Sequence, residues 1–480
     1  MLNTTDIIQS SGIQFGTSGA RGLVEQFTPE VCAAFTHAFI SIMSRQFSFK
    51  KIAVAIDNRP SSPKIAQATV AAIESLGLEA LYYGVIPTPA LAYTAMKAEI
   101  PSIMITGSHI PFDRNGIKFY RPDGEISKSD ERSIVSEAVA FDLLEHALPQ
   151  LVVNPIAANE YKERYTALFD DNLLKGMKVG IYEHSSSGRD IYLDLFHSLG
   201  AEVISLERSD RFVPIDTEAV SESDRQKARI WSIEHDLDFI FSTDGDGDRP
   251  LVADETGEWL RGDILGLLCS YALKAEAVVV PISCNTIIEK SNQFKKVVKT
   301  KIGSPYVIAE FPLLNKDYQS VVGFEANGGY LLGSSINVLG KRLSALPTRD
   351  AVLPALMLLS LSKTSNQSIH ELVAQLPQRF THSDRIQNFP TAKSYQIIDN
   401  IMKNPNDFVE GIGLTYVEVM EMDTTDGLRL YLSDESILHF RPSGNAPELR
   451  CYAEHNNNVN AIKLVELTLG YLNSFMNISK

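Results

Sequence analysis

The sequence predicts three similar α/β domains with mixed sheets, followed by a smaller α+β domain. Up to about residue 380, short apolar runs alternate with stretches whose apolar residues recur at helical spacing, as in βα units. A helix–glycine–strand joint, SLGLEAL at 75–81, returns as SLGAEVI at 198–204, which indicates a duplicated unit. Farther on, two short runs flank a polar link, a pattern typical of an antiparallel hairpin.

The expected elements follow in chain order. Strands are expected at Lys51–Ile56, Glu79–Tyr83, Ser102–Thr106, Lys178–Tyr182, Glu202–Leu206, Ala277–Pro281 and Lys295–Thr300, and the hairpin at Gly427–Leu432 and Ser436–Phe440. Helices are expected at Pro63–Leu76, Asp190–Leu199, Asp263–Ala275 and Asn458–Leu472. Gly77 and Gly200 follow two of these helices, where a positive φ favours glycine. The predicted domains cover residues 1–150, 151–255, 256–375 and 376–480.

Composition and charge limit the function. The chain has 480 residues, with 44 Lys and Arg against 59 Asp and Glu, which gives a net charge of −15. So acidic a chain disfavours nucleic-acid binding, although a local cluster of Arg and Lys could still hold an anionic substrate. Four scattered cysteines without CxxC spacing argue against a disulfide framework and a thiolate zinc site. With no visible signal peptide and no membrane-spanning apolar run, a cytoplasmic enzyme is expected.

Two polar, glycine-containing segments with chemical potential lie in the first domain. FGTSGARG at 15–22 offers backbone N–H groups and Arg21 to an anion, with a glycine-rich turn as the alternative. TGSHIPFDRNGIKFY at 106–120 follows a strand and contains Ser108, His109 and Lys118. Ser108 could carry a phosphoryl group balanced by Lys118, or it could cap a helix. Neighbouring side chains of an extended chain point to opposite sides, so His109 is not the expected base for Ser108.

The segment STDGDGDRP at 242–250 indicates a metal site. Asp244, Asp246 and Asp248 alternate with glycines after an apolar strand, and Arg249 follows them. Three carboxylates so close together are unfavourable unless a cation binds them, and hard oxygen ligands suit Mg²⁺. A calcium loop of the EF-hand type is the rival, but Arg249 stands where that loop needs glycine and the flanks read as strands.

Two later segments offer hydrogen-bonding groups. GFEANGG at 323–329 contains Glu325 and Asn327, which could bind vicinal hydroxyls of a sugar, with a plain turn as the alternative. RPSGNAP at 441–447 follows a strand and could hold a phosphate, although it lacks the spacing of a P-loop. Its candidate donors are Arg441, Ser443, Gly444 and Asn445.

The five segments, taken together, resemble the motifs of the α-D-phosphohexomutase family, which includes phosphoglucomutases, phosphomannomutases and phosphoglucosamine mutases. FGTSGARG resembles FGT-x-G-x-RG, TGSHIP…NGIK resembles TASHNP…NGxK, DGDGDR resembles DGDxDR, and RPSGNAP resembles RPSGTEP. GFEANGG occupies the place of the sugar loop. The resemblance spans residues 15–447 and implies a four-domain fold whose first three domains share one topology.

The resemblance also implies roles for individual residues. Ser108 matches the phosphorylated serine, and a phosphate oxygen on it would join the three aspartates as an Mg²⁺ ligand. Three basic residues match positions in the active site: Arg21, Lys118 and Arg249. His109, beside Ser108, is kept as a catalytic candidate. The positions that match the sugar loop and the substrate-phosphate loop are Glu325, Asn327, Arg441, Ser443, Gly444 and Asn445.

The sequence departs from the family pattern at a few positions. Gly107 replaces Ala and Ile110 replaces Asn in the serine loop, while Asn445 and Ala446 replace Thr-Glu in the last loop. Many bacterial members read GExSGH in the sugar loop, where this chain has Asn327 for the Ser and Gly329 for the His. The EANG stretch looks more like the loop of eukaryotic phosphoacetylglucosamine mutases, so the choice of sugar is the least determined property.

The expected activity is the Mg²⁺-dependent interconversion of a hexose 6-phosphate and its 1-phosphate through a phosphoserine and a hexose 1,6-bisphosphate. Mannose phosphate is the favoured substrate, with glucose phosphate or (acetyl)glucosamine phosphate as alternatives. A sugar phosphatase and a non-catalytic binder of sugar phosphates are the alternatives from other classes. The expected partner is a phosphosugar, with neither nucleic acid nor membrane, and the expected state is a monomer or homodimer.

Overall fold

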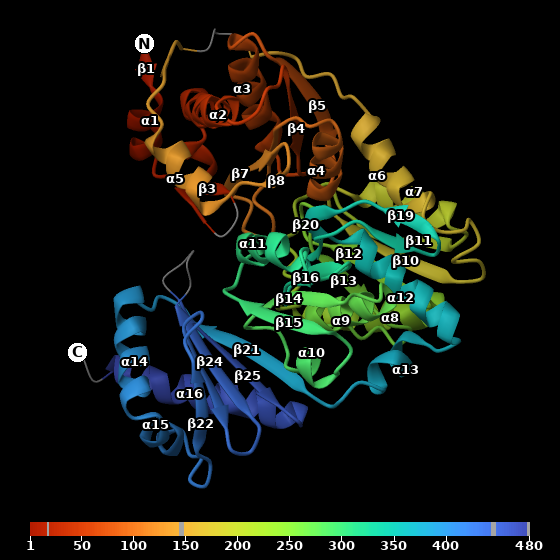
Figure 1. Ribbon diagram of the computed structural model, residues 1–480, viewed down its shortest axis with the longest axis vertical. Helices are drawn as coiled ribbons and strands as arrows, with labels where there is room; N and C mark the ends of the chain where they lie inside the picture. The colour runs from red at the N-terminus through yellow and green to blue at the C-terminus, as the bar shows by residue number, and fades with distance from the viewer. Residues whose placement is uncertain (17–18, 144–147, 443–447, 478–480) are drawn as a thin grey trace.

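The computed structural model describes residues 1–16, 19–143, 148–442 and 448–477. Its larger sheets are four, and they follow one another along the chain from the red N-terminal end to the blue C-terminal end of Figure 1. We call them the first to the fourth sheet. No described helix is long and apolar enough to cross a lipid bilayer.

The first two sheets lie in the N-terminal half of the chain. The first sheet consists of β2 (Gln14–Phe15), β3 (Ala20–Leu23), β4 (Lys51–Ile56), β5 (Glu79–Val85), β6 (Ser102–Ile105), β7 (Arg114–Arg121) and β8 (Gly124–Glu125). Its helices are α1 (Thr4–Ser10), η1 (Val24–Gln26), α2 (Pro29–Ser44), α3 (Ser62–Ser75), α4 (Thr88–Lys97) and α5 (Lys128–Ser136), and β1 (Leu2–Asn3) pairs with β9 (Ala140–Phe141). The second sheet consists of β10 (Lys178–His184), β11 (Glu202–Arg208), β12 (Phe239–Thr243) and β13 (Pro250–Ala253), with α6 (Ile156–Thr166), α7 (Arg189–Ser198) and α8 (Glu222–His235).

The other two sheets complete the chain. The third sheet consists of β14 (Ala277–Pro281), β15 (Lys296–Thr300), β16 (Val321–Phe324), β17 (Tyr330–Leu332) and β20 (Leu346–Asp350), beside the hairpin of β18 (Ile336–Val338) and β19 (Lys341–Leu343). Its helices are α9 (Gly262–Ala272), α10 (Ile287–Lys290), α11 (Ser304–Leu314), α12 (Val352–Ser365) and α13 (Ile369–Ala374). The fourth sheet consists of β21 (Phe380–Ile386), β22 (Val419–Asp423), β23 (Leu428–Leu432), β24 (Ile437–Pro442) and β25 (Leu449–His455), with α14 (Thr391–Lys403), α15 (Pro405–Gly411) and α16 (Asn458–Asn477).

One strand order recurs in the first three sheets. It reads β5-β4-β6-β7 in the first, β11-β10-β12-β13 in the second and β15-β14-β16-β17 in the third. In each of them three strands are parallel and the fourth pairs antiparallel at their edge. The duplication that the repeated joint indicates is therefore confirmed, as is the expectation of mixed sheets.

The fourth sheet differs because all of its pairings are antiparallel. Its β23–β24 hairpin and its terminal helix α16 are those expected from the sequence. The expected strands and helices of the other sheets are also present, with ends shifted by a few residues. The strands of each sheet fall within one of the four predicted domain ranges, and the boundaries themselves stay predictions.

The apolar core does not follow those ranges. One cluster of buried residues runs from Ala53 to Leu372 and includes side chains from the first, second and third sheets. Helix α6 contributes to this sharing, because it packs against α4 and its Tyr161 and Tyr165 hydroxyls donate to Asp350 at the end of β20. Such a shared core fixes the first three sheets relative to one another.

All four cysteines lie inside the protein, and none forms a disulfide. Burial raises the pKa of the Cys32 thiol to about 12. It raises the pKa values of the Cys269, Cys284 and Cys451 thiols as well. Because the thiolate is the reactive form, these four thiols are chemically inert.

Candidate active site

The serine loop follows β6 and enters the site in a strained conformation. Ser108 has a φ of +53°, a value that a non-glycine residue keeps only when its surroundings hold it there. The Thr106 hydroxyl accepts the Ser108 N–H at 2.8 Å, and Arg59 Nη2 donates to the Ser108 carbonyl at 2.8 Å. The Ser108 hydroxyl thereby points towards the metal loop and donates a hydrogen bond to Asp244 Oδ2 at 2.6 Å.

This conformation corrects the expectation for His109. An extended chain would send the two side chains to opposite sides, but the left-handed Ser108 brings His109 Nδ1 to 3.3 Å from the Ser108 hydroxyl. Arg249 Nη1 lies 3.0 Å from the same ring nitrogen. Burial and the Arg249 charge lower the pKa of His109 well below its usual value. His109 is therefore a neutral group in contact with both residues.

Two residues that the sequence analysis missed, Asp57 and Arg59, hold the serine loop in place by hydrogen bonds. Asp57 and Arg59 follow β4 and form a fully buried ion pair at 3.1 Å. Asp57 also accepts the Thr106 hydroxyl at 2.7 Å, while the Arg59 guanidinium donates to carbonyls of the loop. A Cβ on Gly107 would lie 2.5 Å from Arg59 Cζ, so glycine makes room for that guanidinium. Polar residues directly after a predicted strand were the available signal.

The metal loop joins β12 to β13, and its three aspartates are buried. Asp244, Asp246 and Asp248 each present an oxygen atom, and the three atoms lie within 4.8 Å of one another. Burial and the neighbouring Asp246 and Asp248 charges raise the pKa of Asp244 well above its usual value. Glycine at position 245 lets the metal loop lie against the serine loop, since a Cβ there would lie 2.9 Å from the Ser108 carbonyl oxygen.

Protein groups bind some of the carboxylate oxygens of this cluster and leave others without a hydrogen bond. Lys118 Nζ lies 2.5 Å from Asp246 Oδ2 and 2.8 Å from Asp248 Oδ2, and the Thr88 hydroxyl donates to Asp246 at 2.7 Å. The other oxygen atoms, Asp246 Oδ1 and Asp248 Oδ1, are buried without a hydrogen-bond partner. Three carboxylates with two unsatisfied oxygens fit a hard divalent cation. The flanking strands confirm that the loop is not of the EF-hand type.

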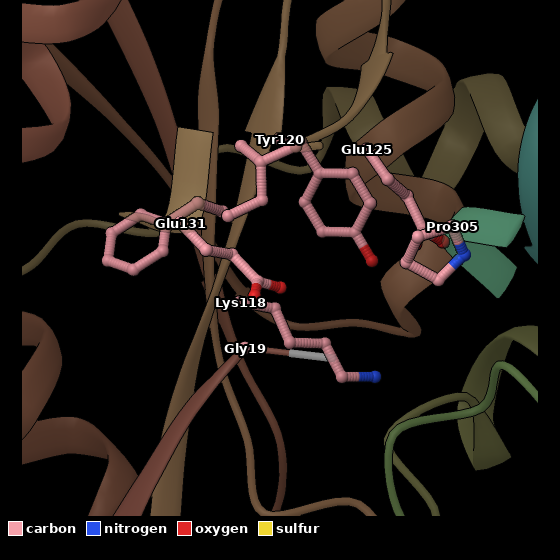
Figure 2. A pocket seen from close by; sticks show the side chains of 8 residues that line it. Gly19, Lys118, Tyr120, Glu125, Glu131 and Pro305 are labelled. Atoms are coloured by element: carbon pink, nitrogen blue, oxygen red, sulfur yellow. The ribbon is translucent and has the colours of Figure 1, made fainter. Parts of the chain in front are cut away.

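Two of the three basic residues, Arg21 and Lys118, come from the neighbouring strands β3 and β7 of the first sheet, and Arg249 comes from the metal loop. Figure 2 shows the Lys118 side chain extending past Gly19, in a small pocket that Glu125 and Pro305 also line. A Cβ on Gly19 would lie 3.0 Å from Lys118 Cγ. On β3, burial and the nearby Arg249 charge lower the pKa of Arg21 to about 10. Arg21, Lys118 and Arg249 therefore meet at one place, as their separate motifs suggested.

The sugar loop follows β16 and meets an arginine that the sequence analysis missed. Glu325 and Asn327 are both buried, and the Asn327 carbonyl accepts the Thr217 hydroxyl at 2.8 Å. Arg349 on β20 contacts both this loop and the metal loop, because its guanidinium lies 3.3 Å from Glu325 and 2.9 Å from Asp248. Arg349 belongs to none of the five segments singled out in the sequence, and it lies about 100 positions from Asp248 along the chain.

The predicted phosphate loop is described only at its start. Arg441 lies near the end of β24 and forms an ion pair with Asp426 at 3.0 Å. The other predicted residues of this loop, Ser443, Gly444 and Asn445, lie outside the described residues.

A serine hydroxyl that contacts a three-carboxylate cluster, with basic residues around it, defines a site suited to metal-dependent phosphoryl transfer. Two family models match the chain, namely domain I of phosphoglucomutase/phosphomannomutase over residues 12–142 and domain III over 261–380. A phosphomannomutase of Salmonella muenchen is 56% identical over 99% of this chain and 98% of its own length. The chain belongs to the phosphoglucomutase/phosphomannomutase family of α-D-phosphohexomutases, which are metal-dependent isomerases.

Other relatives agree with this assignment. A phosphomannomutase of Sinorhizobium fredii (strain NBRC 101917 / NGR234) is 41% identical over 97% of this chain and its full length. Among solved structures, a phosphoglucomutase/phosphomannomutase family protein of Burkholderia thailandensis superimposes with a TM-score of 0.74 at 18% identity. That superposition covers 95% of this chain and 97% of the other, and it supports the four-sheet fold.

Proposed function

We propose that this protein is an Mg²⁺-dependent phosphomutase that interconverts mannose 6-phosphate and mannose 1-phosphate. The observation that carries the proposal is the 2.6 Å contact between the Ser108 hydroxyl and Asp244, inside the three-carboxylate cluster. The choice of mannose rests on the 56% identity to a protein named phosphomannomutase. Glucose phosphate and (acetyl)glucosamine phosphates are the alternative substrates.

The proposed metal ligands are Asp244, Asp246 and Asp248. Two of their carboxylate oxygens have no hydrogen-bond partner, and carboxylate oxygens are ligands that suit Mg²⁺. When bound, the cation would neutralise charge on the oxygens of a phosphoryl group carried by Ser108.

The proposed reaction begins with Ser108 phosphorylated. The bond between phosphorus and Ser108 Oγ breaks as a bond forms to the free hydroxyl oxygen of the hexose monophosphate. The proton of that hydroxyl passes to Ser108 Oγ, which becomes a neutral serine hydroxyl. The resulting hexose 1,6-bisphosphate turns round in the site, and Ser108 takes its other phosphoryl group by the reverse step. Positioning and charge neutralisation supply most of the catalysis of such a transfer.

The surrounding residues take the remaining roles. Lys118 is the candidate for moving the proton, since its ammonium group can donate a proton to the departing Ser108 Oγ and then take up the proton of the hexose hydroxyl. Arg21 and Arg249 hold phosphate charge. Neutral His109 keeps the Ser108 hydroxyl and Arg249 in place. On the substrate side, Glu325 and Asn327 bind sugar hydroxyls. The groups that hold the non-reacting phosphate are Arg441, Ser443, Gly444 and Asn445.

The test follows the conversion of mannose 1-phosphate by phosphorus NMR, with Mg²⁺ and a trace of mannose 1,6-bisphosphate. Wild-type protein should form mannose 6-phosphate, and Ser108→Ala should lose at least about a thousandfold in rate because the phosphoryl acceptor is gone. Ser136→Ala, at an exposed serine, is the matched control and should keep full activity. Robust turnover by the Ser108→Ala protein would overturn the mechanism.

The same assay separates the alternatives. Accumulation of inorganic phosphate would indicate a sugar phosphatase, and binding without turnover would indicate a non-catalytic binder. Ratios of kcat/KM for the 1-phosphates of mannose, glucose and N-acetylglucosamine decide the sugar. We further propose a cytoplasmic location, since a reducing compartment suits four unpaired cysteines. The proposed oligomeric state is a monomer or a homodimer.

A further inference from the structure

Arg349 occupies a central place in the site that no sequence motif indicates. Its side chain is only 2% exposed. Nε and Nη2 lie 3.1 Å and 2.9 Å from Asp248 Oδ2, while Nη1 lies 3.3 Å from Glu325 Oε2. A single guanidinium thus joins the metal loop of the second sheet to the sugar loop of the third. A planar fork of fixed donors suits such a two-carboxylate contact better than a flexible ammonium does.

Gly329, at the end of the sugar loop, provides the space for this arginine. A Cβ at position 329 would lie 2.5 Å from Arg349 Cδ and 2.7 Å from Cγ, distances that real Cβ contacts do not show. These are middle atoms of a side chain whose far end is held by two carboxylates, so the arginine has little freedom to move aside.

The backbone itself does not require glycine at position 329. Gly329 is absent from the residues with positive φ, whereas Gly328 has a φ of +89°. The contact with Arg349 is therefore the physical reason for glycine here. A histidine, which stands at this place in the GExSGH pattern, would overlap Arg349 as it lies in this structure.

We propose that Arg349 is a positioning residue that couples metal binding to sugar binding, and that Gly329 is its required partner. This inference rests on the proposed mutase function. Asp248 is a proposed metal ligand and Glu325 a proposed sugar contact, so one guanidinium fixes the two carboxylates relative to each other. Loss of the fork should disturb both binding events together.

The first experiment compares Arg349→Gln and Arg349→Lys with wild-type protein. Calorimetry measures Mg²⁺ binding alone, and separately mannose 6-phosphate binding. Arg349→Gln should weaken both by about tenfold or more, because Asp248 and Glu325 lose the guanidinium that fixes their orientation, and this loss should outweigh the removal of a positive charge near Mg²⁺. Arg349→Lys should be intermediate, since it keeps the charge but not the fork. Initial rates should show a raised KM as well as a lowered kcat. A folded Arg349→Gln protein with wild-type binding of both would overturn the proposal.

The second experiment adds one methyl group at Gly329, which displaces Arg349 without removing it. Gly329→Ala should weaken both binding events about tenfold in the wild-type background, because the new methyl group displaces Arg349. In an Arg349→Ala background the same change should add less than about twofold, since the space is then free. Equal effects in the two backgrounds would contradict the pairing.

Two controls complete the design. Gly470→Ala, on a helix position where a Cβ meets nothing within 4 Å, should leave activity and both affinities unchanged. The wild-type protein separates the two proposals: if it converts no hexose phosphate, the proposed function fails. If wild type is active and the Arg349 variants bind as it does, only the present inference fails.

Discussion

The first three sheets and the fourth sheet are held in the molecule by different kinds of contact. One apolar cluster runs through the first three sheets, from residue 53 to residue 372. In the described part of the chain, the cluster beneath the fourth sheet draws only on residues 386–472. Apolar burial supplies most folding free energy, so the two parts are expected to unfold as separate units.

The junction between the third and fourth sheets is instead polar. Glu454 on β25 is 3% exposed and forms an ion pair at 2.6 Å with Arg379, which directly precedes β21 of the same sheet. The Thr286 N–H beside α10 donates to the same carboxylate at 3.1 Å, and Asp426 accepts the N–H of Ile302 at 2.9 Å. Buried polar contacts fix an orientation while adding little net stability. The candidate active site around Ser108 therefore lies in the part that shares one core, whereas Arg441 belongs to the part with its own core.

The largest expected effect comes from truncating one phenylalanine in each part. Phe241 lies in the shared cluster against Phe196, with ring centres 5.1 Å apart, and Phe440 packs on Phe408 at 5.3 Å. Each change to Ala should cost about 3–5 kcal/mol, but only in its own part. Both tryptophans, Trp231 and Trp259, lie near the second sheet, so their fluorescence during urea unfolding reports the first three sheets.

Circular dichroism in the same titration reports both parts. Phe241→Ala should move the fluorescence transition to lower urea, and Phe440→Ala should leave it in place while shifting a second transition seen by dichroism. Equal shifts of the fluorescence transition in the two variants would show that the molecule unfolds as one unit.

The next effect tests the polar junction. Glu454→Gln removes the charge that balances Arg379, and breaking a buried pair in this way should cost about 3 kcal/mol. The loss should appear in the dichroism transition of the fourth sheet. A matching shift in tryptophan fluorescence would mean that the junction stabilises both parts.

A smaller effect should follow from pH. Burial lowers the pKa of His439 in the fourth sheet to about 4, and its Nε2 lies 2.7 Å from the Asp426 carbonyl. The unfolded chain takes up this proton near pH 6.5, before the folded chain does. Stability from the neutral ring is thus complete above pH 6.5 and falls as the pH drops towards 4, by about 2 kcal/mol at pH 5.

The measurement compares unfolding at pH 7.5 and pH 5 for wild type and His439→Gln. The variant cannot titrate at this position, so the pH dependence of the fourth-sheet transition should shrink. An unchanged pH dependence would assign the effect to other groups.

The smallest effect is expected at an exposed ion pair. Lys97 on α4 and Glu160 on α6 meet at 2.8 Å, and the Lys97 side chain is 56% exposed. Lys97→Met should cost about 0.5 kcal/mol or less, because water screens such pairs. A loss above about 1.5 kcal/mol in the fluorescence transition would mean that polar contacts also hold the first three sheets together.

The sequence predicted the features that depend on residues close together in the chain and on the order of the motifs. Apolar runs predicted the strands, and the motif order predicted that Ser108, Lys118 and the three aspartates would meet. It did not reveal His109 beside Ser108, because a positive φ at a serine leaves no pattern. Arg349 was missed for another reason: its partners lie on two other segments of the chain, and only the folded arrangement brings them together. The shared core likewise depends on how the sheets pack.

The four buried thiols make this chain a convenient background for distance measurements by fluorescence. Maleimide dyes react with thiolates, so cysteines introduced at two exposed positions would be labelled without removing the native ones. Lys64 on α3 and Tyr416, which is 97% exposed, would place one dye on each of the two parts. Energy transfer between them, with and without mannose 6-phosphate, would then test whether the distance between the two parts changes when substrate binds.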